Sequence, residues 1–184
     1  MYVNFGKDYM SISQFVDRSE LQSYLSHCDE SVKTVLGNNC EQPKEFFAVT
    51  IYQGNESKRF GIGIISESFG NQPHILIMPN KHFLIVGYNR DVAIFNFLDK
   101  SFSKTISLGS VFFKFIQLHE PEYNLILILH ELGLLAITDQ GKEVWKYDCD
   151  IIENYHITNG FISLSTMDEQ TVKIGLLDGK IYKY

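Results

Sequence analysis

The chain has 184 residues, which is enough for one sizeable hydrophobic core but too few for two ordinary domains. Hydrophobic residues make up 45% of the chain and charged residues 21%, which argues against wholesale disorder. Aromatic residues reach 14%, and that composition favours strands over helices. The sequence therefore predicts a single, mainly β domain over residues 1–184.

The cellular compartment is indicated by features that the sequence lacks. The first residues, MYVNFGKDYMSISQF, do not combine a basic start with an apolar run, as a secretory signal does. The apolar stretches are of strand length, far below the roughly 20 residues of a membrane span. Cys28, Cys40 and Cys149 are an odd number without metal or redox spacing, which is typical of reduced thiols. We expect a cytoplasmic protein with no membrane partner.

The N-terminal part, residues 1–45, is expected to be a helical segment. Ser13 with Asp17, or Ser11 before Gln14, offers the capping chemistry of a helix start, and apolar residues follow at helical spacing. A second short helix is expected in ESVKTVLG, residues 30–37, ending at Gly37, where glycine suits a left-handed cap. Residues 38–45 read as a linker, so the expected helices end here.

The pattern changes to strand-like alternation from Phe46 onward. Within residues 46–73, FFAVTIYQ and KRFGIGIISE flank GNES and predict a hairpin. Gly61 and Gly63 have no third glycine and no helix behind them, so they do not form a nucleotide-binding loop. Instead they indicate a strand in which small residues permit close backbone approach or a bulge.

Residues 74–184 contain three groups of four short strands. The connections are too short for crossover helices, so neighbouring strands should be antiparallel. Asn96, Asp139 and Asp178 occupy equivalent places in the three groups, at spacings of about 40 residues that are typical of propeller blades. The expected fold is an open half-propeller of three antiparallel four-stranded meanders plus the hairpin. In the alternative, the hairpin completes a fourth, imperfect blade.

One segment strengthens the blade interpretation by resemblance. LLAITDQGKEVWKYD, residues 134–148, resembles the closing half of a quinoprotein-type propeller repeat, with a strand, an acidic turn, Gly-Lys and a Trp-containing strand. The resemblance implies blade architecture. It implies no quinone cofactor, because three blades cannot enclose the central site of a closed ring.

The sequence shows no arrangement typical of catalysis. The six histidines are isolated from one another, and no HxH, HExxH or CxxC spacing occurs. His27 and Cys28 are adjacent in an expected helix, so their side chains point about 100° apart and do not converge on a metal. We therefore expect no enzyme activity, no metal and no cofactor. A propeller-type enzyme remains the alternative if distant blades bring a polar cluster together.

Negative charge is concentrated in the stretch from His119 to Glu169. It holds ten acidic residues against Lys142 and Lys146. An acidic surface repels phosphate, so direct nucleic-acid binding is disfavoured and a basic protein partner is favoured. The bland interpretation is that these charges provide solubility and stabilise turns. The candidate partner-binding residues are Glu120, Glu122, Tyr123, Tyr147, Asp148, Asp150, Glu153 and Tyr155.

A small, acidic chain of this kind is similar in overall character to the immunity proteins of bacterial contact-dependent growth-inhibition systems. The resemblance implies a protein that binds and neutralises the basic C-terminal toxin domain of a secreted effector, commonly a nuclease. An acidic face would occlude the active site by mimicking the charge of the substrate. The alternative is a propeller-like interaction scaffold with another cellular partner.

Overall fold

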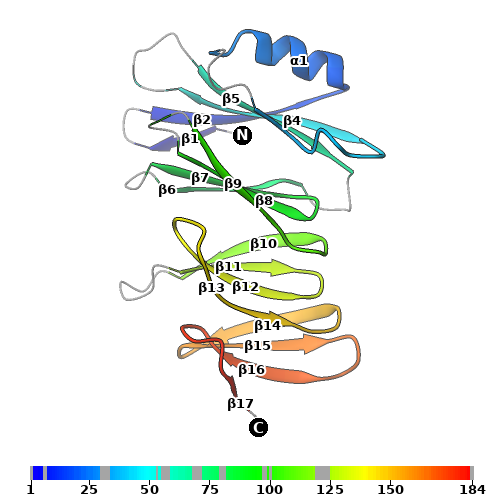
Figure 1. Cartoon of the computed structure of the whole chain (residues 1–184), viewed down its shortest axis with the longest axis vertical. Helices are drawn as coiled ribbons and strands as arrows, with labels where there is room; N and C mark the ends of the chain where they lie inside the picture. The colour runs from blue at the N-terminus through cyan, green and yellow to red at the C-terminus, as the bar shows by residue number, and fades with distance from the viewer. Residues whose placement is uncertain are drawn as a thin grey trace. The chain divides into compact units, whose positions relative to one another are not determined.

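The structure is a computed structural model. It describes residues 2–5, 8–29, 34–52, 54, 59–67, 72–78, 82–96, 99, 101–118 and 125–182. These residues are mainly β, with one helix and four sheets, which confirms the expected fold class (Figure 1). Their contacts separate into two compact units, Met1–Ile106 (unit 1) and Ser107–Tyr184 (unit 2), and each unit is described by itself. No helix in the described ranges is long and apolar enough to cross a bilayer.

Unit 1 contains a five-stranded sheet, a helix and one four-stranded meander. The five-stranded sheet has the order β1-β2-β4-β5-β3, in which β3 runs parallel to β5 and the other neighbours are antiparallel. The strands of this sheet are β1 (Tyr2–Phe5), β2 (Asp8–Phe15), β3 (Thr34–Leu36), β4 (Glu45–Tyr52) and β5 (Arg59–Ser66). The helix, α1 (Arg18–Ser26), lies between β2 and β3 in the sequence. The meander comprises β6 (His74–Met78), β7 (Phe83–Tyr88), β8 (Asp91–Asn96) and β9 (Ser101–Ser107).

The prediction of a helical segment over residues 1–45 was wrong in most of its length. Only Arg18–Ser26 is helical in the described part of it, because β2 pairs with β4 from Tyr9 to Phe15 and is held as a strand. Of the second expected helix, residues 30–33 lie outside the described residues and Thr34–Leu36 form a strand beside β5. The hairpin of β4 and β5 is confirmed, but it forms the middle of a larger sheet.

Helix α1 begins at Asp17, which is the cap itself rather than a partner of Ser13. The Asp17 carboxylate accepts the Glu20 backbone N–H at 2.9 Å, and the Glu20 carboxylate accepts the Val16 backbone N–H at 3.1 Å. Two of the otherwise unpaired amides at the helix start are thereby satisfied. This capping fixes where the chain turns from β2 into the helix.

The two glycines of β5 allow α1 to lie close against the five-stranded sheet (Figure 1). A Cβ atom at Gly61 would lie 2.7 Å from the Cys28 sulfur, and one at Gly63 would lie 2.8 Å from a Leu25 methyl carbon. Leu21 and Leu25 are buried in this contact. The interpretation of these glycines as a point of close approach is confirmed.

The other face of the five-stranded sheet packs against the β6–β9 meander. Val49 and Ile62 from the sheet share one apolar cluster with Leu84 and Phe95 from the meander, and all four are buried. The rings of Phe60 and Phe95 meet edge to face with centroids 6.2 Å apart. Unit 1 therefore has three layers, namely helix, five-stranded sheet and four-stranded meander.

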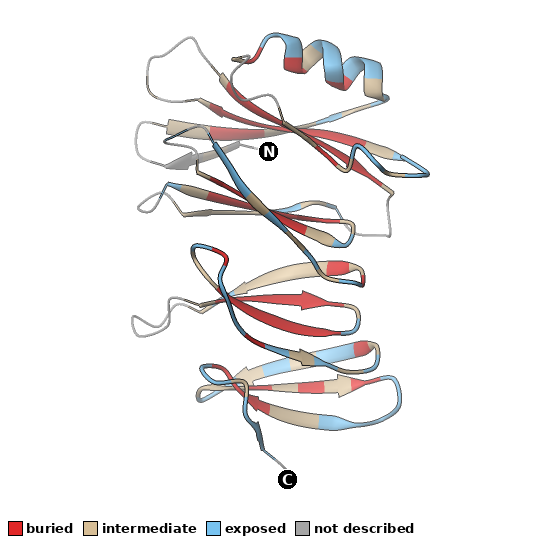
Figure 2. Ribbon diagram, viewed as in Figure 1, coloured by how far each residue is buried: buried red, intermediate tan, exposed pale blue. Residues whose placement is uncertain are grey.

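Unit 2 consists of two four-stranded antiparallel meanders packed face to face. Leu127, Leu134, Ile162 and Ile174 are fully or almost fully buried between them (Figure 2). Together with the meander of unit 1, these confirm the three predicted four-stranded blades. The strands are β10 (Phe112–Gln117), β11 (Leu125–His130), β12 (Gly133–Thr138), β13 (Glu143–Asp148), β14 (Ile152–Thr158), β15 (Phe161–Thr166), β16 (Thr171–Gly175) and β17 (Ile181–Tyr182).

Trp145 joins the two meanders of unit 2. Its indole N–H donates to the Leu176 carbonyl at 3.0 Å, from β13 to the turn after β16. Gly179 lies against the ring, and a Cβ atom there would be 2.7 Å from an indole carbon. The indole ring of Trp145 therefore packs in the space that a side chain at position 179 would otherwise occupy.

Candidate functional site

One edge of unit 2 gathers three connections of the chain, and we call it the acidic edge. It comprises the β11–β12 turn (131–132), the end of β13 with the β13–β14 connection (148–151) and the β15–β16 turn (167–170). Backbone bonds hold these parts together, because the Cys149 N–H donates to the Leu132 carbonyl at 3.0 Å and the Met167 N–H donates to the Ile151 carbonyl at 2.9 Å. Figure 1 shows the three connections at the same end of the sheets.

The acidic edge has a charge pattern of its own. Its three segments contain no lysine or arginine, whereas two described turns of the opposite edge each contain an acid and a base: Asp139 with Lys142 in sequence, and Asp178 with Lys180 in an ion pair of 3.0 Å. The contrast is between these described turns. The carboxylates of the acidic edge are Glu131, Asp148, Asp150, Asp168 and Glu169.

Two of the predicted site residues, Asp148 and Asp150, lie together on this edge. Burial, followed by the nearby charges of Asp150, Asp148 and Asp168, raises the pKa of the Cys149 thiol to about 11. Three carboxylates from two different connections thus act on the pKa of one thiol. Asp168 belongs to this group, although it was not among the candidate partner-binding residues.

The carboxylates on this edge differ in whether their bonding partners carry a positive charge. Asp148 forms an ion pair of 2.9 Å with Lys146, and both side chains are well exposed, so the pair is screened by solvent. Asp150 accepts the N–H of the next residue, Ile151, at 2.7 Å. The Thr166 hydroxyl and the Gln170 amide donate to the Asp168 carboxylate. The donors to these last two carboxylates are uncharged, unlike the Lys146 ammonium at Asp148.

The predicted residue Glu153 and the two described tyrosines have different surroundings. Glu153 is exposed on β14, at the irregularity that follows Ile152. Tyr147 and Tyr155 are half-buried and pack against the core of unit 2. The ammonium of Lys114 lies 4.6 Å from the centre of the Tyr155 ring. Both tyrosines therefore support the fold more than they extend toward a partner.

Three predicted residues, Glu120, Glu122 and Tyr123, lie outside the described residues. The described ends of the strands on either side, Gln117 and Ile126, pair with each other. That pair is at the opposite end of the sheet from Asp148, which pairs with Gly133. The structure thus brings together Asp148 and Asp150 and adds Asp168.

Two apolar residues of the acidic edge were missed in the sequence. Leu132 is 40% exposed in the β11–β12 turn, and Met167 is 58% exposed in the β15–β16 turn. Their backbone bonds to residues 149 and 151 place them on either side of the β13–β14 connection. The signal available in the sequence was a large apolar residue in each of two tight polar turns, where solvent exposure is expected.

The described residues do not show a metal-binding arrangement. Within the described ranges, no group of three or more His, Cys, Asp or Glu side chains is placed to hold an ion. His130 is buried instead, with Nδ1 2.7 Å from the Ser110 hydroxyl, and burial lowers its pKa. The arrangement of the acidic edge is suited to binding through charge and apolar contact.

No protein-family model matches this sequence, and no curated protein matches it either. Solved structures resemble it. Hydrazine synthase from Kuenenia stuttgartiensis is 13% identical over 83% of this chain and 47% of that chain, with a TM-score of 0.50. BamB from Moraxella catarrhalis is 9% identical over 74% and 42%, with a TM-score of 0.48. The designed protein Ika4 is 10% identical over 64% and 74%, with a TM-score of 0.45.

These likenesses bear on the fold alone. Hydrazine synthase is a propeller-like protein, and this chain has a propeller-like β fold. The chain spans less than half the length of hydrazine synthase or of BamB. The propeller-like part of the sequence resemblance is confirmed, and the immunity part stays a prediction.

Proposed function

We propose that this chain is a binding protein that recognises a basic protein partner through the acidic edge of unit 2. The observation that carries the proposal is the combination of charge and apolar surface on the acidic edge. Exposed Leu132 and Met167 lie there among carboxylates whose loops contain no lysine or arginine. Charge that served only solubility would not need exposed apolar side chains beside it.

The combination of charge and apolar contact suits a protein partner. Uncompensated carboxylates attract a positively charged surface over a distance and raise the rate of association. Exposed apolar side chains at the same place supply contact area that is removed from water when the partner binds. Leu132 and Met167 would supply that area here, with the carboxylates around them.

The finer form of the proposal is toxin immunity. A nuclease carries a positive active-site surface because its substrate is a polyanion. An acidic edge with apolar contacts would occupy that surface and exclude the nucleic acid. The toxin would be a basic C-terminal domain of a secreted effector, and the chain would inhibit it without performing chemistry of its own.

The proposal is tested by capturing the partner and then asking whether the chain protects against it. The chain is immobilised as bait in a lysate of its source cells, and bound proteins are identified by mass spectrometry. We expect a basic protein in stoichiometric amount. Cells that express this protein should be inhibited, and co-expression of the chain should restore their growth.

The outcomes separate the two parts of the proposal. A basic partner that is harmless to cells would contradict toxin immunity and favour the interaction scaffold. An acidic partner, or no stoichiometric partner, would contradict recognition through the acidic edge. Growth that is not restored by the chain, despite binding, would contradict inhibition.

A further inference from the structure

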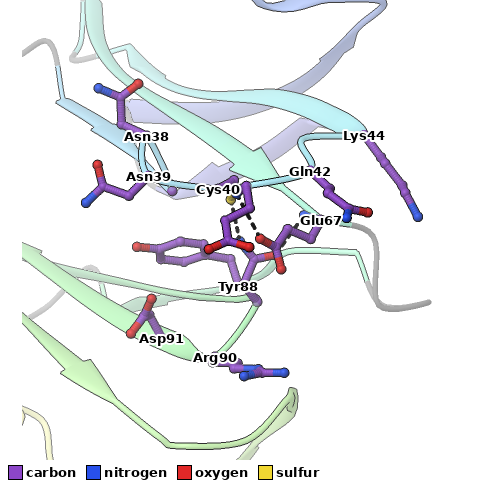
Figure 3. A pocket seen from close by; sticks show the side chains of 12 residues that line it. Asn38, Asn39, Cys40, Gln42, Lys44, Glu67, Tyr88, Arg90 and Asp91 are labelled. Carbon is purple, nitrogen blue, oxygen red and sulfur yellow. Dashed lines mark hydrogen bonds between the residues drawn. The ribbon is translucent and has the colours of Figure 1, made fainter.

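A polar pocket of about 730 Å³ lies in unit 1, apart from every residue considered above as a site (Figure 3). Residues 37–42 and 44 form one wall, Glu67 follows β5, and residues 88–91 at the β7–β8 turn form the other wall. The volume falls within the range of small-molecule sites in proteins. All the lining residues belong to unit 1.

The floor of the pocket is fixed by the side chain of Asn89. Its amide oxygen accepts the Ser66 hydroxyl at 2.9 Å and the Glu67 N–H at 3.1 Å. Its amide nitrogen donates to the Ile65 carbonyl and to the Cys40 sulfur, both at 3.2 Å. Asn89 has a φ of +46°, a conformation that asparagine tolerates better than most residues. The two walls are therefore tied together before any ligand binds.

The loop that forms the first wall is also held in place. The Lys44 N–H donates to the Ser66 carbonyl at 2.9 Å, and the Glu41 N–H donates to Glu67 Oε1 at 3.2 Å. The Cys40 thiol lies 3.3 Å from the Ile65 carbonyl, to which it donates. A wall held by bonds of this kind needs little reordering when a ligand enters, which lowers the cost of binding.

Charges of both signs act on the inner part of the pocket. Burial, then the charge of Glu67 and to a smaller extent that of Asp91, raise the pKa of the Cys40 thiol. The Asn89 hydrogen bond and the Arg18 charge oppose this rise. Asp91 also contributes, again after burial, to raising the pKa of Tyr88 to about 12. The thiol and the phenol are therefore neutral at physiological pH. The thiol does not act as a nucleophile, so the pocket is suited to binding rather than to covalent chemistry.

The lining carries positive charge as well. Lys44 and Arg90 line the pocket together with the carboxylates of Glu41, Glu67 and Asp91. A polyanion would be repelled by the three carboxylates, and a polyamine would be repelled by the two cations. Neutral amides contribute the remaining polar groups, from Asn38, Asn39 and Gln42.

The buried position of Tyr88 narrows the ligand class further. Its side chain is 6% exposed, so it offers no open ring face on which a sugar could stack. A charged and amide-rich lining also disfavours an apolar ligand, because the lining groups would lose water without gaining partners. A ligand with one ammonium and one carboxylate satisfies both signs of charge at once.

We propose that the unit 1 pocket binds a small zwitterion of the amino-acid or dipeptide type. The ammonium group binds the Glu67 carboxylate, and the carboxylate group binds the Arg90 guanidinium. The amides of Asn38, Asn39 and Gln42 accept and donate hydrogen bonds to the polar middle of the ligand. This function is independent of the acidic edge of unit 2.

The proposal is tested by isothermal titration calorimetry with the dipeptide L-alanyl-L-glutamine. The controls are the same dipeptide acetylated at its N-terminus and amidated at its C-terminus, putrescine, and succinate. We expect saturable binding of the free dipeptide at millimolar concentration or below. The blocked dipeptide, the diamine and the dicarboxylate should each bind at least about tenfold more weakly, because each lacks one or both charge contacts.

Two variants of the pocket and one control locate the binding site. Glu67→Gln retains an oxygen that can accept the Glu41 N–H, and Arg90→Gln removes the cation; each should weaken dipeptide binding about tenfold or more. Glu143→Gln, at an exposed glutamate of β13 in unit 2, should leave it unchanged. Circular dichroism verifies that each variant is folded.

Several results would overturn the proposal. They are the absence of saturable dipeptide binding to the folded chain, equal binding of the blocked dipeptide, and equal loss in the Glu143→Gln control. Undiminished binding in folded Glu67→Gln and Arg90→Gln would also overturn it, since the ligand would then lie elsewhere.

Discussion

The hydrogen bond between Ser110 and His130 lies in a buried place, where the neutral form of the histidine is favoured. The Ser110 hydroxyl lies 2.7 Å from Nδ1 of His130 and accepts the Leu132 N–H at 3.3 Å. With Ser110 donating to Nδ1, the imidazole is neutral and the hydroxyl oxygen still accepts the Leu132 N–H. A second proton, on Nδ1, would reverse the first bond and place a charge in a buried position.

This histidine should make the stability of unit 2 depend on pH. Burial lowers the pKa of His130 below its ordinary value, against a smaller opposing attraction from Asp148. The unfolded chain therefore takes up the proton first as the pH falls below about 6.5, the ordinary pKa of histidine, and the free energy of unfolding decreases. The decrease stops once the pH is below the pKa of the folded state.

The measurement is urea unfolding between pH 8 and pH 5, followed by fluorescence of Trp145, the single tryptophan of the chain. The wild-type chain should lose more stability over this range than His130→Gln, which has no imidazole to protonate. Equal pH dependence in the two proteins would show that His130 is not the responsible group.

At the scale of elements, α1 is held by a fit between leucines and glycines. A Cβ atom at Gly63 would lie 2.8 Å from Leu25 and 3.3 Å from Val35. Because Gly63 is not among the glycines with positive φ, the expected effect of alanine comes from crowding rather than from backbone strain.

Gly63→Ala should therefore destabilise unit 1 by about 1–3 kcal/mol, the usual cost of overpacking a core. Leu25→Ala removes the methyl carbon that the new Cβ would meet. The cost of Gly63→Ala should accordingly be smaller in the Leu25→Ala background than in the wild type. The four proteins are compared by urea unfolding with circular dichroism, and strictly additive costs would contradict this packing.

The blades were predictable from the sequence because the residues that specify their strands and turns are close together in the chain. In LLAITDQGKEVWKYD, alternation, an acidic turn and a glycine specify two paired strands without reference to distant residues. The N-terminal part was not predictable in the same way. Asp8–Phe15 becomes a strand through pairing with Glu45–Tyr52, and Thr34–Leu36 through parallel pairing with Arg59–Ser66. Such pairings leave no signal in a short window.

The candidate sites were likewise predictable only where their residues are close together in the sequence. Asp148 and Asp150 were predictable because they flank one connection of two recognisable strands. Asp168 was not, because it reaches that connection through the bond from the Met167 N–H to the Ile151 carbonyl. The unit 1 pocket was not predictable either, since Cys40, Glu67 and Asn89 come from three separate segments and form no motif.

At the scale of the whole molecule, the two units carry different charge. Unit 2 contains 11 acidic and six basic residues, a net charge of −5, whereas unit 1 carries −1. Part of this excess lies on the acidic edge, whose loops contain no lysine or arginine. We therefore expect association with a basic partner to depend on where charge is changed, and not only on how much.

The most direct test uses two double variants with the same change in net charge. Asp150→Asn with Glu169→Lys alters the acidic edge, and Asp139→Asn with Glu143→Lys alters the opposite edge. The association rate constant of each protein with the captured partner is measured by stopped-flow at increasing salt. The account predicts slower association and a weaker salt dependence for the acidic-edge variant, with the opposite-edge variant close to wild type. Equal effects of the two variants would contradict recognition through the acidic edge.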